Sequence, residues 1–216
     1  MSKTEAVSSF LAKAFPEAEC SLIFSNPFEC LCAVMHSAQA TDESVNKATP
    51  ALFRAFPDAK NLAKADLKTV EGYIQSIGLY HNKAKNLIAL AKALEEKYGG
   101  QVPNDFAALT ALPGVGIKTA NVTLAECFAR PSFPVDTHVG RVSKRLGFAR
   151  EDDEPIDIEK KLEKAFPKEE WIPLHHRVIA FGRAICHAKK PECDRCELHE
   201  HCRYFKKTSL TTGKKS

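Results

Sequence analysis

Tryptophan occurs once in this chain of 216 residues, and runs of β-branched residues are few. Sheets are enriched in β-branched and aromatic residues, so this scarcity argues against a β-sheet core. Leucine, alanine and lysine dominate instead, and 44% of the residues are hydrophobic, which is enough for a real core. We therefore expect an all-α protein, folded as one large domain or two small lobes.

The sequence also lacks an apolar leader and any apolar run long enough to cross a membrane. It begins with the polar residues Met-Ser-Lys-Thr-Glu-Ala. We therefore expect a cytoplasmic protein with no membrane partner, in a reducing compartment where disulfides are rare. Its eight cysteines are then free thiols or metal ligands.

Neither sign of charge dominates, because 31 basic residues face 27 acidic ones and the net charge is +4. Any nucleic-acid surface must therefore come from local clustering. One cluster lies on the helix expected over 137–146, where Arg141, Lys144 and Arg145 recur along one side; it is either a solvated face or a phosphate-contacting face. Residues 206–216 are basic without apolar periodicity, and we expect a flexible tail there.

A tight turn lies at Leu-Pro-Gly-Val-Gly, where Gly114 and Gly116 permit unusual backbone angles and a close approach to the backbone, while Val115 is an apolar anchor. A helix is expected from 117 to 129, so the turn presents free backbone N–H groups at a helix N-terminus, a site suited to phosphate. This pattern is typical of a helix-hairpin-helix, which grips a nucleic-acid backbone without reading bases. A lone Gly-Val-Gly can also be an ordinary turn.

Lys118 lies in the first turn of that helix, where the helix dipole disfavours a cation. A surface lysine gains nothing there, whereas a nucleophilic amine must be neutral in order to attack. The dipole, burial and nearby cations would all favour the neutral form. Lys118 is therefore a candidate nucleophile, and a plain surface lysine is the alternative.

Asp136 is within reach of that amine. The helix from Lys118 to residue 129 is about 18 Å long, and six extended residues returning to Asp136 cover about 20 Å. The carboxylate can therefore lie beside the lysine, an arrangement suited to attack on a sugar carbon in DNA. Asp136 can also be simply the N-cap of the helix over 137–146, or serve both purposes.

Four cysteines follow the pattern C-x6-C-x2-C-x5-C within one loop: Cys186, Cys193, Cys196 and Cys202. Zinc prefers two separated C-x2-C pairs, and only one occurs here, so one compact loop with unequal gaps favours a [4Fe–4S] cluster, with zinc as the alternative. Lys189 and Lys190 lie between the first two cysteines, which suggests phosphate binding. The other cysteines are interpreted as structural thiols: Cys20, Cys30, Cys32 and Cys127.

With these features in view, the chain resembles the endonuclease III family of helix-hairpin-helix DNA repair glycosylases. The resemblance runs from about Asn26 to Tyr204. It is carried by residues 37–42 (Ser-Ala-Gln-Ala-Thr-Asp), 78–80 (Gly-Leu-Tyr), 112–116 with 118–121, 135–138 (Val-Asp-Thr-His) and the cysteine spacing.

The resemblance implies two all-helical lobes: a six-helix barrel with the hairpin over residues 22–131, and a [4Fe–4S] lobe from 1–21 plus 132–205. It implies a base-excision-repair enzyme, both glycosylase and AP lyase, acting as a monomer on double-stranded DNA that contains an oxidised pyrimidine or an abasic site. The same resemblance places it with the nucleoid in the cytoplasm.

It also implies roles for single residues. Lys118 would attack C1′ of the flipped nucleotide, and β-elimination would then cut the strand 3′ to the lesion. Asp136 would assist lysine deprotonation and stabilise positive charge on the sugar. Gln39 would fill the vacated space, Leu79 would wedge the opposite strand, and His138 would lie near the flipped nucleotide. From local sequence alone, a solvated Gln39 and a Leu79 folded back into the core remain open.

One departure is Ile117, which stands where the family often has arginine, so one phosphate contact is in doubt. Competing interpretations are an adenine glycosylase acting opposite oxidised guanine and a thymine-mismatch glycosylase, and Lys118 argues against both. A non-enzymatic DNA-binding iron–sulfur protein fits the hairpin and cysteines equally well, but leaves the lysine and the aspartate unexplained.

Overall fold

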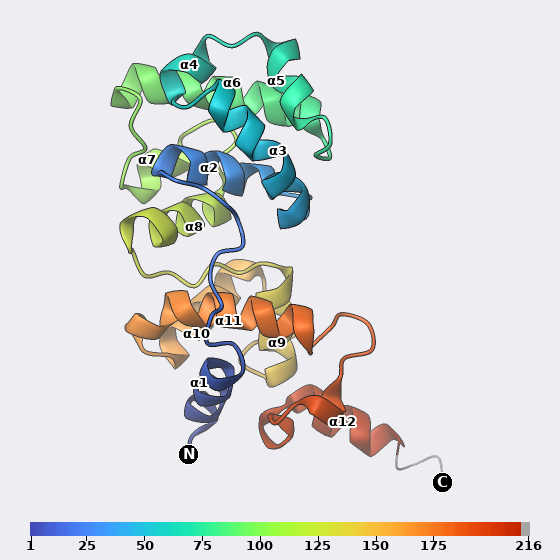
Figure 1. The fold of residues 1–216 in the computed structure, drawn as a ribbon. Helices are drawn as coiled ribbons and strands as arrows, with labels where there is room; N and C mark the ends of the chain where they lie inside the picture. The colour runs from blue at the N-terminus through green and yellow to red at the C-terminus, as the bar shows by residue number, and fades with distance from the viewer. Residues whose placement is uncertain (213–216) are drawn as a thin grey trace. The chain divides into compact units, whose positions relative to one another are not determined.

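The computed structural model describes residues 1–212 and contains no β-strand among them, which confirms the all-α expectation. The helices divide into two units, residues 20–130 and residues 1–19 with 131 onward, which can be followed in Figure 1. No described helix is both long and apolar enough to span a membrane. The roles assigned to residues 22–131 and to 1–21 with 132–205 stay predictions.

Within residues 20–130, short polar side chains begin most of the helices. Each accepts a hydrogen bond from a backbone N–H of the first turn, which satisfies one of the free donors there. These caps are Asn26, Thr41, Asp58, Asp66 and Asp105. The helices are α2 (Pro27–His36), α3 (Asp42–Ala55), α4 (Ala59–Ala63), α5 (Leu67–Ile74), α6 (Tyr80–Tyr98), α7 (Phe106–Thr110) and α8 (Ile117–Phe128). The short α4 adds to the six helices expected.

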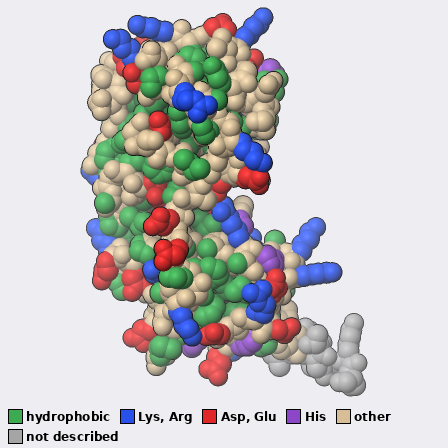
Figure 2. Space-filling view, in the orientation of Figure 1, with side chains coloured by type: hydrophobic (Ala, Val, Ile, Leu, Met, Phe, Trp, Pro, Cys, Tyr) green, Lys and Arg blue, Asp and Glu red, His purple; other side chains and the backbone are tan. Residues whose placement is uncertain are grey.

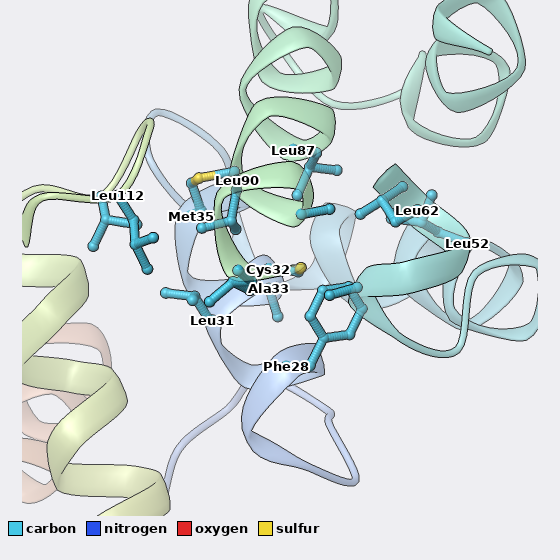
Figure 3. Close-up of a cluster of buried hydrophobic side chains, with 14 of the residues drawn as sticks. Phe28, Leu31, Cys32, Ala33, Met35, Leu52, Leu62, Leu87, Leu90 and Leu112 are labelled. Atoms are coloured by element: carbon cyan, nitrogen blue, oxygen red, sulfur yellow. The ribbon is translucent and has the colours of Figure 1, made fainter. Parts of the chain in front are cut away.

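Helix α2 is the central core helix of this unit, because nearly all of its side chains are buried. Figure 3 shows side chains of α2 meeting Leu87 and Leu90 of α6, with Leu112 nearby. Leu109 of α7 and Val115 belong to the same core. Burying one such side chain contributes about 1.5–3 kcal/mol relative to leaving it exposed. These anchors therefore fix the segment from α7 to α8.

The other unit is built from α1 (Lys3–Ala14), α9 (Thr137–Leu146), α10 (Pro155–Ala165), α11 (Trp171–Ala184) and α12 (Arg203–Thr212), with short 3₁₀ turns at Lys168–Glu170, Cys193–Arg195 and His199–His201. Its core joins Leu11 of α1, Val142 of α9 and Phe181 of α11. Phe133, fully buried, anchors the segment that leads into α9. The packing holds both ends of α9 in place.

Residues 206–212 of the tail expected to be flexible are helical as part of α12, and the flexibility itself stays a prediction. Contacts at the start of this helix explain the difference. The ring of Tyr204 lies 4.6 Å from the Arg145 guanidinium, and Phe205 stacks on His199 with ring centroids 4.2 Å apart. Once a first turn is fixed, helix formation propagates at little cost. Residues 213–216 of the expected tail lie outside the described residues.

Candidate functional site

The hairpin turn requires glycine at position 114 for two reasons. Gly114 has φ of 75°, and an added Cβ would lie 2.9 Å from the Sδ of Met35. Gly116 then occupies the N-cap of α8 and makes no side-chain cap bond, unlike the capped helices of the same unit. The first N–H groups of α8 are therefore suited to an acceptor from outside the chain, such as a phosphate.

Two predicted site residues at this turn differ in how they can act. The side chain of Val115 is 7% exposed and belongs to the core, so only its backbone is suited to contact DNA. Lys118 is exposed in the first turn of α8. The burial expected for this lysine is therefore wrong.

Gln39 and Leu79, although far apart in sequence, lie in adjacent loops. A Cβ added at Gly78 would lie 3.6 Å from the carbonyl oxygen of Gln39. Both residues have a left-handed backbone, with φ of 56° at Gln39 and 61° at Leu79. Leu79 is 58% exposed, so the alternative in which it folds back into the core is wrong. The structure brings together the two loops that carry the side chains expected to enter the duplex.

Asp136 is the N-cap of α9, as one interpretation of the sequence expected. Its Oδ1 accepts a hydrogen bond from the backbone N–H of Val139 at 2.7 Å. This bond holds the carboxylate at the positive end of the helix, where negative charge is favoured. Asp136 belongs to the unit that begins at residue 131 and Lys118 to residues 20–130, so their pairing stays a prediction.

His138, two residues further on, is held by Arg141 and by a glycine. The Nη2 of Arg141 lies 3.1 Å from the Nδ1 of His138 and donates to the carbonyl oxygen of Gly182 at 2.8 Å. A Cβ at Gly182 would lie 3.1 Å from the Cβ of His138. Burial lowers the pKa of His138; the Asp136 carboxylate opposes this shift and Arg141 reinforces it. The ring is therefore positioned as a largely neutral group.

The basic side of α9 binds the cysteine loop. The sequence predicted either a solvated face or a phosphate-contacting face there. The Nη1 of Arg145 donates to the carbonyl oxygen of His187 at 2.6 Å and to the Sγ of Cys186 at 3.3 Å. Its Nη2 donates to the carbonyl oxygen of Ala188 at 3.0 Å. Arg141 likewise donates to the Cys186 carbonyl at 3.0 Å. No local pattern reveals this, because the partners lie 41–45 residues later in the chain.

The four cysteines of the loop line one pocket, which other loop residues and apolar side chains such as Phe181 and Ile185 complete. Burial, followed by the neighbouring thiols, raises the pKa of Cys193. The backbone N–H of Phe205 donates to the Sγ of Cys202 at 3.4 Å. Four sulfurs around one space, with donors aimed at two of them, fit an iron–sulfur cluster as ligand set.

The same loop exposes its two lysines. Lys189 and Lys190 both lie on the surface, and Lys190 has φ of 51°. The N–H of Glu192 donates to the Ile185 carbonyl at 2.9 Å, which closes the loop that carries them. Over the face drawn in Figure 2, basic and acidic side chains are intermixed.

Within the described residues, no group of three or more possible ligands is arranged to hold a single metal ion.

An all-helical fold, a hairpin with an uncapped second helix and a four-cysteine loop define a class of protein. Residues 32–168 match the family described as HhH-GPD superfamily base excision DNA repair protein, and the chain belongs to this superfamily. It is 49% identical to "Endonuclease III" of Bacillus subtilis (strain 168) over 88% of this chain and 86% of that protein. It is 44% identical to "Endonuclease III" of Escherichia coli (strain K12) over 90% and 92%.

Solved structures agree with this assignment. A trapped endonuclease III–DNA covalent intermediate matches with a TM-score of 0.92 at 48% identity, covering 97% of this chain and 99% of that one. A thermostable thymine-DNA glycosylase matches with a TM-score of 0.86 at 22% identity, which shows the fold alone.

Proposed function

We propose that Lys118 is the nucleophile of this enzyme and that oxidised pyrimidines such as thymine glycol are its substrates. The chain is a DNA repair enzyme, a bifunctional DNA glycosylase and AP lyase, and DNA is its partner. The observation that carries the assignment is the exposed amine of Lys118 in the first turn of a helix whose N-terminus is suited to phosphate. A relative with 48% identity was trapped covalently on DNA, which supports a covalent mechanism.

In the proposed reaction, the neutral amine of Lys118 attacks C1′ and displaces the damaged base. The amine gives up a proton, which the departing base takes up. The bond from C1′ to O4′ then breaks as O4′ is protonated, and a Schiff base joins Lys118 to C1′. Loss of a proton from C2′ then breaks the bond from C3′ to the phosphate oxygen, which cuts the strand 3′ to the lesion. Asp136 stabilises the positive charge that develops on the sugar and assists deprotonation of the lysine.

The remaining contacts hold the DNA. The hairpin backbone at Gly114, Val115 and Gly116 binds the phosphates. Gln39 enters the space left by the flipped nucleotide, and the exposed Leu79 wedges the opposite strand. His138 lies near the extruded nucleotide, and the two loop lysines, Lys189 and Lys190, contact backbone phosphates. The adjacency of the Gln39 and Leu79 loops supports a shared task for these two side chains.

We also propose that Cys186, Cys193, Cys196 and Cys202 hold a [4Fe–4S] cluster. When bound, the cluster would fix the loop that exposes the two lysines, and no step of the base-removal reaction passes through it. Cys196→Ser should lose the brown visible absorbance and its iron, while Cys32→Ala, which changes a cysteine outside the loop, should keep both. Zinc in place of iron in the purified protein would contradict the assignment.

The test of the nucleophile is borohydride trapping on a duplex with one thymine glycol. Wild type should form a covalent adduct, and Lys118→Ala should bind the duplex without forming one. Lys60→Ala, which removes an exposed lysine of α4, is the matched control and should be trapped like wild type. An adduct with Lys118→Ala would refute the lysine assignment. Tight binding by wild type without an adduct would indicate a monofunctional glycosylase or a DNA-binding redox protein.

We further propose that the enzyme works as a monomer in the cytoplasm, associated with the nucleoid where its substrate lies. Elution of the free protein and of its DNA complex from a sizing column, each at a mass of one chain, checks the first point. Fluorescence microscopy of a tagged chain in a DNA-stained bacterial host checks the second.

A further inference from the structure

Three of the four cysteines outside the metal loop gather where α2 packs against α8. Cys30 of α2 is fully buried, and Cys127, near the end of α8, packs against the buried cluster that Cys30 forms with Val34 and Val122. Cys20, in the segment before α2, lies close enough to interact electrostatically with both. Cys32 packs instead in the main core of the unit. The grouping links positions 97 residues apart, so the sequence alone does not reveal it.

We propose that Cys30 and Cys127 form an oxidisable thiol pair that hydrogen peroxide converts into a disulfide between α2 and α8. The geometry brings the two thiols together, because Cys127 packs against the buried cluster that contains Cys30, where α2 packs against α8. Cys127 is partly accessible, whereas Cys30 is enclosed by Leu22, Val34 and Val122.

The two thiols differ in reactivity. The hydrogen bond from Cys30 lowers the pKa of Cys127, and a larger thiolate fraction makes Cys127 the better nucleophile. The same hydrogen bond and then burial raise the pKa of Cys30, so that thiol stays protonated. Burial raises the pKa of Cys20 to about 12, which makes it a poor competitor. Peroxide should therefore react first at Cys127.

The reaction balances with peroxide as the only oxidant. The Cys127 thiolate attacks one peroxide oxygen, the O–O bond breaks, and hydroxide leaves with the proton released when the thiol ionised. The resulting sulfenic acid is attacked by the sulfur of Cys30, and its hydroxyl leaves as water with the Cys30 proton. Two thiols and one hydrogen peroxide thus give one disulfide and two waters. The sulfurs lose two electrons and the peroxide gains them.

The cross-link would join two helices that carry the DNA chemistry. Lys118 lies in the first turn of α8, and α2 ends three residues before Gln39. A disulfide would hold these helices together by a bond that thiols can reverse. The proposal depends neither on Lys118 as nucleophile nor on the identity of the metal, so it can fail or succeed independently of both.

Peptide mapping of the intact holoprotein tests the pair. The protein is treated with hydrogen peroxide, unfolded in N-ethylmaleimide to block the remaining thiols, and digested without reductant by trypsin and a glutamate-specific protease. Glu29 and Glu126 immediately precede the two cysteines, so each begins its own peptide. The expected product joins the peptide that begins at Cys30 to the one spanning Cys127–Arg141, since trypsin does not cleave before Pro131, and it is lighter than their sum by two hydrogens.

Two variants sharpen the result. Cys32→Ala removes the only other cysteine of the Cys30 peptide and should keep the cross-link. Cys127→Ser should lose it, and dithiothreitol should reverse it in wild type. The proposal is overturned if peroxide leaves Cys30 and Cys127 open to alkylation, or drives Cys127 to sulfinic acid without a cross-link. A link from either residue to Cys20 or to the metal loop would overturn it equally, and these wild-type outcomes do not depend on any variant folding.

Discussion

The Oδ1 of Asp136 and the backbone N–H of Val139 lie 2.7 Å apart, so the proposed catalytic carboxylate is also a helix cap. Any loss of activity in an Asp136 variant can therefore arise from a frayed helix or from lost chemistry. Two substitutions separate these causes, because asparagine caps helices about as well as aspartate whereas alanine does not.

We expect Asp136→Asn to keep the free energy of unfolding near that of wild type and to lose most base release, because the amide carries no charge. Asp136→Ala should lose base release as well and should lower the free energy of unfolding by about 1 kcal/mol. Urea unfolding and single-turnover release of thymine glycol measure the two effects. Normal turnover by Asp136→Asn would refute the proposed charge role.

The hydrogen bonds of Arg145 predict that the stability of the metal loop depends on α9. Arg145→Gln removes a charged group that hydrogen-bonds the carbonyl oxygens of His187 and Ala188 and the Sγ of Cys186. Breaking hydrogen bonds to a charged, partly buried group should lower the free energy of unfolding by about 2 kcal/mol.

The measurement for Arg145 is the rate at which the visible absorbance of the metal centre fades on heating. It should rise in Arg145→Gln and take an intermediate value in Arg145→Lys, which keeps the charge but loses the planar fork. Arg150→Gln, at an exposed position just beyond α9, should behave as wild type. Equal fading rates in wild type and the three variants would contradict a stabilising role of Arg145 in the metal loop.

The close contact between Gly182 and His138 can be tested by adding a methyl group at position 182. In Gly182→Ala the new Cβ would lie 3.1 Å from the Cβ of His138 and 3.2 Å from the Nη2 of Arg141, closer than ordinary contact. We expect this variant to be less stable by about 1–3 kcal/mol and to release damaged base more slowly, because the imidazole must move.

Gly140→Ala is the matched control, because its new Cβ would meet nothing closer than 3.7 Å. Alanine also favours a helix by about 1 kcal/mol over glycine, so this variant should be at least as stable as wild type. Thermal unfolding and single-turnover assays of both variants check the pair. A Gly182→Ala enzyme with unchanged stability would mean that α9 and α11 yield at this contact.

His36 predicts a pH dependence of stability. It is fully buried at the end of α2, and neither ring nitrogen has a hydrogen-bond partner within the described part of the chain. Burial, and then the nearby Lys83, lower the pKa of His36 from 6.5 to about 3. Between these two pKa values, His36 is protonated in the unfolded chain and neutral in the folded chain. Stability is therefore lost as the pH falls below about 6.5, by about 2 kcal/mol at pH 5 from this group.

We expect His36→Leu to remove that part of the slope and to be more stable than wild type at pH 7, because the two unpaired ring nitrogens are then no longer buried. His81→Gln, which changes an exposed histidine, should leave most of the slope in place. Denaturant unfolding at pH 5, 6 and 7 measures the slopes. A slope in His36→Leu equal to that of wild type would show that other groups cause it.

The sequence by itself determined the all-α class, the helix starts at Ile117 and Thr137 and the position of the hairpin. Asn26 and Asp136 act on N–H groups three residues away, and Gly114 acts on its own backbone. Such interactions form within one turn of chain and survive in any tertiary arrangement, so local pattern is enough to predict them. The four-cysteine loop is local in the same sense, since it spans 17 residues.

Only the tertiary structure decided how several side chains are used. The sequence left Arg145 open as a solvated or phosphate-binding residue, yet it binds carbonyl groups more than forty residues later. Cys127 packs against the Cys30 cluster because α2 packs on α8, and Leu79 is exposed in a loop that lies beside that of Gln39. The physical reason is common to these cases: hydrogen bonding and burial depend on which distant segments come together, and residue type and spacing do not encode that choice locally.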